Sequence, residues 1–137
     1  MPNKSEKTTE LFLDAGRMMK KELLAKADSL PFTQAEVLRF VHEKGDPLMS
    51  DVAKHFAISA PSATSLVNQL ARGGYLERKG NVEDRRQVHL HATKKAVSEL
   101  TAIMDKRKKI IQALLQGLSD KDHSDMQRVL QKMLKNK

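Results

Sequence analysis

The spacing of apolar residues along the chain predicts a mainly helical protein. Apolar side chains recur every three or four residues in six segments, which is the period of an amphipathic helix. The first segment covers residues 9–27, with Phe12, Ala15, Met19, Leu23 and Ala27 on one stripe. Further helices are expected over residues 33–44, 50–56, 60–72, 94–116 and 120–134. The polar residues before position 9 are expected to be frayed.

Capping signals mark the expected helix starts. Thr33 to Glu36 has the Thr-x-x-Glu spacing of a capping box, in which each side chain bonds the other residue's backbone N–H. Hydroxyl side chains precede the other helices, where an N-cap oxygen accepts from a free backbone N–H. These expected caps are Ser50, Ser59, Thr93 and Ser119.

The period changes to two between the fourth and fifth helices. Residues 75–78 and 87–91 alternate as strands do, and the polar stretch 80–86 between them predicts a hairpin loop. Two short helices joined by about three residues and followed by a hairpin predict a mainly α, winged helix-turn-helix fold over residues 32–93. The additional N- and C-terminal helices, in residues 1–31 and 94–137, are expected to form a dimerisation layer, because long amphipathic helices at both ends need a partner surface. The alternative is that they pack within one chain.

Composition narrows the function classes. The 137 residues amount to about one domain, and Lys and Arg exceed Asp and Glu by 25 to 17, a net charge of +8. The absence of Cys excludes disulfides, thiolate zinc sites and thiol redox sensing. Aromatic residues make up 4%, too few for a binder that stacks single-stranded bases. No apolar run reaches the length of a membrane span, and the first residues lack an apolar leader, so a cytoplasmic protein is expected.

The outer face of the fourth predicted helix carries short polar side chains and almost no charge. Such groups read base edges in the major groove of a duplex, which admits one helix. Ser59 and Ser62 at the N-terminus are also placed to meet a phosphate. The alternative is an ordinary solvated face. The candidate DNA-binding residues here are Ser59, Ser62, Thr64, Ser65, Asn68, Gln69 and Arg72.

The predicted hairpin adds cations near its tip. Arg85 and Arg86 suit a narrow minor groove of high negative potential, and Lys79 is expected to neutralise a phosphate. Asp84 is expected to support the wing by holding Arg86 in one rotamer. The alternative is a polar turn with an ion pair.

Residues 33–93 resemble the MarR family of bacterial and archaeal winged-helix regulators. The segments that carry the resemblance are Leu48–Ala53, Ser62–Thr64, Leu66–Leu70, Gly74–Arg78, Asp84–Arg86 and Ala92-Thr93. The resemblance implies a homodimer whose two wings lie about one helical turn apart on a pseudo-palindrome. The chain departs from the family at Ser65, where many members have Arg, and at Asn68-Gln69, where many have Asp-Arg. The residues expected at the dimer interface are Phe12, Met19, Leu114, Leu118, Met126, Leu130 and Met133.

The same resemblance implies a small apolar or phenolic effector. Phe12, Met18, Met19 and Phe32 are candidates to line its site, although Met and Phe at helical spacing are more often core residues. His89 and His91 share one strand face, from which two histidines can bind a metal ion. Such a pair more often faces solvent or lies near a phosphate. We therefore expect neither a metal nor a cofactor. No set of candidate catalytic side chains has the spacing of a known catalytic site, so we do not expect an enzyme.

Together these features predict a sequence-specific, duplex-DNA-binding transcriptional regulator. We expect a homodimeric repressor that reads a pseudo-palindromic operator, associates with the nucleoid when bound, and is released by an effector. The alternative is a winged-helix protein-interaction module that binds DNA only weakly and without specificity. The neutral face of the fourth helix favours the regulator, because a merely electrostatic binder would gain from Lys there.

Overall fold

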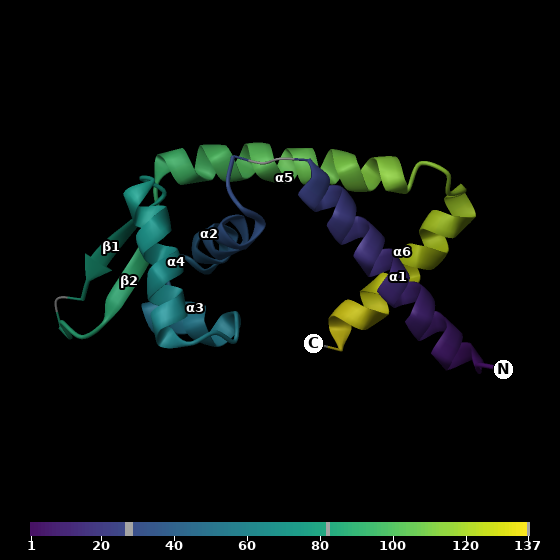
Figure 1. The fold of residues 1–137 in the computed structure, drawn as a ribbon, viewed down its shortest axis with the longest axis horizontal. Coiled ribbons are helices and arrows are strands. Elements are labelled where there is room, and N and C mark those ends of the chain that lie inside the picture. The colour runs from purple at the N-terminus through teal and green to yellow at the C-terminus, as the bar shows by residue number, and fades with distance from the viewer. Residues whose placement is uncertain (27–28, 82, 137) are drawn as a thin grey trace.

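The computed structural model describes residues 1–26, 29–81 and 83–136, and within them the chain forms six helices and one hairpin (Figure 1). The mainly helical winged fold predicted from the periodicity is confirmed. The elements in chain order are α1 (Lys4–Ala25), α2 (Phe32–Lys44), α3 (Met49–His55), α4 (Ala60–Arg72), β1 (Leu76–Gly80), β2 (Val88–Ala92), α5 (Lys94–Leu114) and α6 (Asp120–Lys135).

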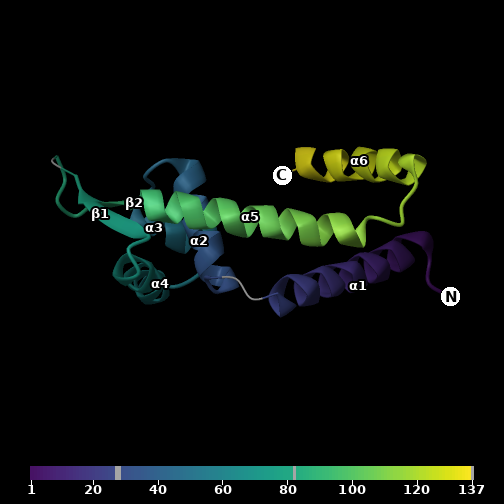
Figure 2. The same ribbon diagram turned by 90° about the horizontal axis from the view of Figure 1, so that it is seen from above.

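Helix α5 lies along the long axis of the molecule and joins two lobes (Figure 1). We call α2, α3, α4, the hairpin and α5 as far as Arg107 the winged-helix lobe. We call α1, α6, the end of α5 from residue 110 onward and the connection that follows it, residues 115–118, the helical lobe. Helices α1 and α6 cross in Figure 1 but stand apart in Figure 2, so they lie at different depths in the first view.

The winged-helix lobe has a continuous apolar core. Each of its helices contributes residues at three- or four-residue spacing, as an amphipathic helix on a core should. Helix α5 completes this core with Ala96 and Ile103, which are 0% and 3% exposed. The largest fully buried side chains are Val37, Leu38, Val41, Val52, Val67, Leu70 and Leu90.

Three of the predicted N-caps are confirmed. The Ser59 hydroxyl oxygen accepts from the Ser62 N–H at 3.2 Å, and that of Thr93 accepts from the Ala96 N–H at 3.2 Å. Ser119 accepts from the Asp122 N–H at 3.1 Å, and the Asp122 carboxylate accepts from the Ser119 N–H at 3.0 Å. The starts of α4, α5 and α6 are therefore fixed by side chains within one turn of each helix.

Two predicted caps are wrong. Helix α2 starts at Phe32 after Pro31 without a side-chain cap, and the Glu36 carboxylate binds Arg39 and Arg107. Ser50 lies inside α3, whose N-cap position is Leu48. There the Asp51 carboxylate accepts from the Leu48 N–H at 2.9 Å, so an acid in the first turn replaces the expected hydroxyl.

Helix α1 begins five residues earlier than predicted. The Asn3 side chain accepts from the Glu6 N–H and Glu6 accepts from the Asn3 N–H, both at 2.9 Å. This reciprocal cap holds residues that were expected to fray. At the other end α1 stops at Ala25, and the predicted stripe residue Ala27 lies outside the described residues.

The hairpin is tied to the start of α3. Strands β1 and β2 are antiparallel, with Leu76 opposite Ala92 and Gly80 opposite Val88. The Leu90 N–H donates to the Pro47 carbonyl at 2.8 Å, and Leu48 forms a bridge with His89. These bonds anchor the base of the wing beside the helix-turn-helix.

Candidate nucleic-acid interface

Helix α4 turns its neutral polar face outward. Ala63, Val67 and Leu70 are buried at 0% exposure, so the opposite face of the helix meets solvent. All seven residues predicted here from the sequence are exposed: Ser59, Ser62, Thr64, Ser65, Asn68, Gln69 and Arg72. The face is therefore free to enter a groove about as wide as a helix.

Two adjacent amides on this face are held by other elements. The Arg78 guanidinium of β1 donates to the Asn68 side-chain oxygen. The Gln34 amide of α2 donates to the Gln69 side-chain oxygen at 2.7 Å. The Thr64 hydroxyl on the same face differs from these amides, because it donates to the Ala60 carbonyl of its own helix at 3.0 Å. The amides are thus oriented from outside the helix.

A basic cleft lies between α4 and β1. It has a volume of about 410 Å³ and is lined by Asn68, Ala71, Arg72 and Arg78. Sequence reasoning missed Arg78. Its only signal was strand alternation, which places residue 78 on a hairpin face but does not say that its side chain reaches α4.

At the wing tip, the structure brings Asp84 and Arg86 into contact. The Arg86 backbone N–H donates to the Asp84 carboxylate at 3.0 Å, and its Nε lies 3.3 Å from the same oxygen. The Arg86 side chain is 92% exposed and that of Asp84 only 37%. Arg85 and Lys79 are also exposed. The tip therefore presents cations to whatever approaches the wing.

At the wing base, the two histidines of β2 both bond to Asp46. His89 Nδ1 lies 2.9 Å from the Asp46 carbonyl oxygen, and His91 Nδ1 lies 2.8 Å from its carboxylate. The hydrogen bond from His91 lowers the pKa of the Asp46 carboxyl below its usual value. No group of three metal-capable side chains forms within the described residues, and these histidines serve instead to join the wing to the turn before α3.

The helical lobe carries a second, apolar feature. A groove of about 870 Å³ runs between α1, α6 and the end of α5. Of the four candidate effector-lining residues, Phe12, Met18 and Met19 line this groove, whereas Phe32 lies under the Arg107 guanidinium. All seven residues predicted for the dimer interface line it: Phe12, Met19, Leu114, Leu118, Met126, Leu130 and Met133.

An ion pair joins α5 to α2 in the winged-helix lobe, at the end that faces the helical lobe. Arg107 Nη1 lies 2.6 Å from the Glu36 carboxylate, and the guanidinium carbon lies 4.5 Å from the centre of the Phe32 ring. Arg39 binds the other Glu36 oxygen at 2.8 Å. Partial burial acts to raise the pKa of Glu36, but the bonds and charges of Arg39 and Arg107 outweigh it and leave the pKa below its usual value.

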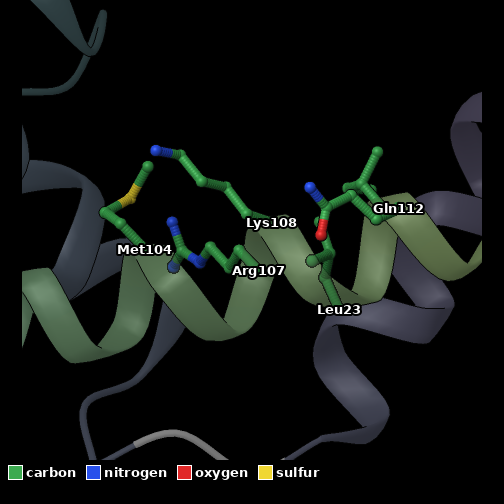
Figure 3. A pocket seen from close by; sticks show the side chains of 6 residues that line it. Leu23, Met104, Arg107, Lys108 and Gln112 are labelled. Atoms are coloured by element: carbon green, nitrogen blue, oxygen red, sulfur yellow. The ribbon is translucent and has the colours of Figure 1, made fainter.

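Arg107 also borders a small hollow. The residue is 8% exposed, and its Nε and Nη2 are buried without a hydrogen-bond partner. The hollow, of about 360 Å³, lies between the end of α1 and the middle of α5. Figure 3 shows the Arg107 and Lys108 side chains extending toward Met104, with Leu23 and Gln112 at the other end. Buried N–H groups without acceptors favour an incoming oxygen.

Among the described helices, none is long and apolar enough to cross a membrane.

The helix-turn-helix, the exposed α4 face and the anchored hairpin together define a winged helix-turn-helix protein. Solved structures share this fold. MepR, a transcription regulator of the Staphylococcus aureus multidrug efflux pump MepA, superposes with a TM-score of 0.78 at 21% identity, over 93% of this chain and 96% of that one. Streptococcus pneumoniae FabT in complex with DNA gives a TM-score of 0.71 at 23% identity, over 96% of this chain and 92% of that one.

Sequence comparison finds similar proteins as well. Residues 28–87 match the sequence model of the MarR family. The uncharacterized HTH-type transcriptional regulator YwhA of Bacillus subtilis (strain 168) is 22% identical over 97 residues, which are 71% of this chain and 70% of that protein. Over these residues the chain is similar to the MarR family, and the relative that it matches is an HTH-type transcriptional regulator.

Proposed function

We propose that this protein is a homodimeric repressor that binds a pseudo-palindromic duplex DNA operator. Residues 32–93 contact the DNA, and residues 1–31 and 94–137 form the dimerisation region. The protein acts in the cytoplasm and associates with the nucleoid when bound. The observation that carries the proposal is the neutral polar face of α4, exposed beside a wing whose Arg86 is tethered by Asp84. A helix in the major groove and an arginine in the minor groove are complementary ways to contact one duplex.

A structural neighbour supports DNA as the partner. FabT, which shares the fold, was solved in complex with DNA. The net charge of +8 adds the attraction to phosphates that duplex binding requires. Ser59 and Ser62 at the start of α4 are available to a phosphate oxygen, and Lys79 adds a cation on β1.

The apolar groove of the helical lobe supports a homodimer. Met126, Leu130 and Met133 of α6 are 38–43% exposed, and Phe12 of α1 is 56% exposed. Exposed apolar surface of this extent marks an interaction site in a water-soluble protein. A second copy offers the same helices in a symmetric arrangement, so each copy's α6 covers the other's groove.

We include a small apolar or phenolic effector in the proposal. The hollow beside Arg107 supports it, because an apolar lining next to unpaired N–H groups suits a ring that carries an oxygen. Because Leu23 and Ile111 belong to the helical lobe and Arg107 to the winged-helix lobe, a ligand there would contact both lobes. Phenol added to the protein–operator complex should then release DNA from the wild type and not from Arg107→Met.

The competing function is a protein-interaction module with weak DNA binding. A selection of genomic duplex fragments at about 0.15 M salt, followed by footprinting, separates the two. A regulator prefers its site over random duplex by about 10³-fold or more. The module would show no preference and a steep loss of affinity with salt.

Arg86→Ala tests the wing within the same experiment. We expect the operator affinity to fall by roughly 1–3 kcal/mol. Glu83→Ala is the matched control, because Glu83 is an exposed acid of the same loop and should not weaken binding. Unchanged affinity in Arg86→Ala would refute the wing assignment, and no enriched fragment with the wild type would refute the proposed function.

A further inference from the structure

The contact between Arg78 and Asn68 fixes which way the Asn68 amide points. A guanidinium has five N–H donors and no acceptor, so it bonds only to the oxygen of the amide. The Asn68 side-chain oxygen is therefore turned toward β1, and its NH₂ group is left for whatever meets the exposed face of α4. The orientation follows from chemistry and does not depend on telling oxygen from nitrogen in the amide.

Arg78 is well placed to hold this orientation. Its backbone pairs with Leu90, which is fully buried, so the strand position is fixed by the core. Asn68 lies one position after the fully buried Val67 on α4. Two side chains from separate, anchored elements thus meet at the surface. Gln34 and Gln69 make a parallel arrangement, but a pair of amides can bond in either orientation, so it does not fix the polarity.

This polarity matters for reading a base. A free asparagine favours adenine, because its oxygen accepts from N6 while its NH₂ donates to N7. With the oxygen engaged by a cation, Asn68 is left mainly as a donor. Guanine presents two acceptors, O6 and N7, on its major-groove edge. The Asn68 NH₂ group can donate to that edge, whereas the N6 donor of adenine finds the Asn68 oxygen already engaged by the Arg78 cation.

We propose that Arg78 sets the base preference of Asn68, so that the pair takes guanine where a free asparagine would take adenine. This inference rests on the proposed binding of duplex DNA and adds which base α4 selects. Arg78 acts as a positioning residue for Asn68. The competing role for Arg78 is a phosphate contact made with Arg72 across their shared cleft, which would carry no sequence information.

The test is a selection from duplexes with randomised half-sites. The full-length wild type, Arg78→Met, Asn68→Ala and the double variant are compared by base frequency at each position, and the enriched duplexes are then ranked by competition. The wild type should prefer guanine to adenine by about tenfold at one base pair per half-site. Asn68→Ala should lose that preference, and Arg78→Met should shift it to adenine while other positions keep theirs.

Two further variants sharpen the outcome. Arg78→Lys keeps a donor-only cation and should retain the guanine preference. Lys79→Met, the control on the next residue of β1, should weaken binding to all sequences alike. Arg78→Met should have no further effect on this base pair in the Asn68→Ala background. Because Asn68, Arg78 and Lys79 are all exposed, thermal unfolding should be unchanged in every variant.

The failures are distinguishable. If the wild type enriches no site, the proposed function fails and this inference falls with it. If the wild type enriches a site but Arg78→Met keeps the same base profile at lower affinity, the arginine is a phosphate contact and only this inference is overturned. A wild-type preference for adenine at the Asn68-dependent position overturns it as well.

Discussion

The winged-helix lobe and the helical lobe carry the same kind of amphipathic helix but bury it to different extents. In the winged-helix lobe, Leu38, Leu70 and Leu90 are 0% exposed. In the helical lobe, Phe12 is 56% exposed and Leu130 is 42% exposed, and none of the residues described in α1 or α6 is buried. An apolar stripe shows that a helix has a partner. It does not show whether that partner lies in the same chain or in another one. The packing in the structure separates the two cases.

Leu130→Asp should abolish the proposed association of two copies through their helical lobes. A carboxylate in the centre of the proposed interface would be desolvated without a partner, which costs far more than a lost methyl contact. We expect a monomer by sedimentation at micromolar concentration. The winged-helix lobe should stay folded, with its near-wild-type helical signal in circular dichroism. Gln131→Asp is the control, because Gln131 is exposed and does not line the groove. A dimer that survives Leu130→Asp contradicts the proposed interface.

Leu70→Ala should destabilise the winged-helix lobe. Leu70 is fully buried in α4, and its truncation leaves a cavity in a closed core. The free energy of unfolding should fall by about 4 kcal/mol, measured by urea denaturation. Leu24→Ala, on a side chain that is 54% exposed in α1, should change it by less than about 0.5 kcal/mol. Equal losses at both positions would mean that the two lobes are equally well packed.

Glu36→Gln tests the ion pair that joins α2 to α5 in the winged-helix lobe. It leaves Arg107 without its charged partner, and we expect a loss of about 3 kcal/mol, the range for breaking a buried pair. Glu43→Gln is the matched control, since Glu43 binds only the exposed side of Arg39 and its side chain is 60% exposed. A loss as large in the control would show that Arg39, and not Arg107, makes the important bond.

The same pair gives the wild type a pH dependence of known sign. The pKa of Glu36 is lower in the fold than in the unfolded chain, so its contribution is complete above the unfolded value of about 4.3. It is lost as the pH falls through the lower, folded value. Urea unfolding between about pH 5 and pH 3 should therefore show a steeper loss of stability in the wild type than in Glu36→Gln. Parallel curves would contradict this account.

Asn3→Ala should have the smallest effect. Its side chain caps α1 through the Glu6 N–H, and removing an N-cap costs about 1 kcal/mol. We expect a small decrease in the thermal midpoint at fixed protein concentration, because α1 belongs to the lobe that needs a partner. Lys4→Ala, the next residue, should change nothing. An unaltered midpoint in Asn3→Ala would mean that residues before Thr9 add nothing to α1.

Local signals made much of the fold predictable. Ser59, Thr93 and Ser119 each act within one helical turn, so their role is visible in a short stretch of sequence. Glu36 was misassigned because its partner Arg107 lies 71 residues away, and a capping box fits the same letters. Long-range partners of this kind have no local signature.

The exposed residues of the candidate interface were predictable for the same reason. The α4 face follows from the spacing of its buried residues, and the Asp84–Arg86 contact spans two positions. Arg78 was missed because the register of β1 against β2, and the packing of the hairpin on α4, decide what its side chain reaches. The hollow beside Arg107 likewise depends on how α1 meets α5.

Helix α5 has a mechanical consequence, because it belongs to both lobes. Its 21 residues span about 32 Å at 1.5 Å per residue, without a proline or glycine to bend them. Such a helix acts as a lever. A tilt of about 5° at the proposed dimer interface would displace its other end, next to the wing, by about 3 Å. That displacement equals the length of a hydrogen bond. A small change in how two copies pivot on each other would therefore suffice to bring both wings into or out of register with a single operator.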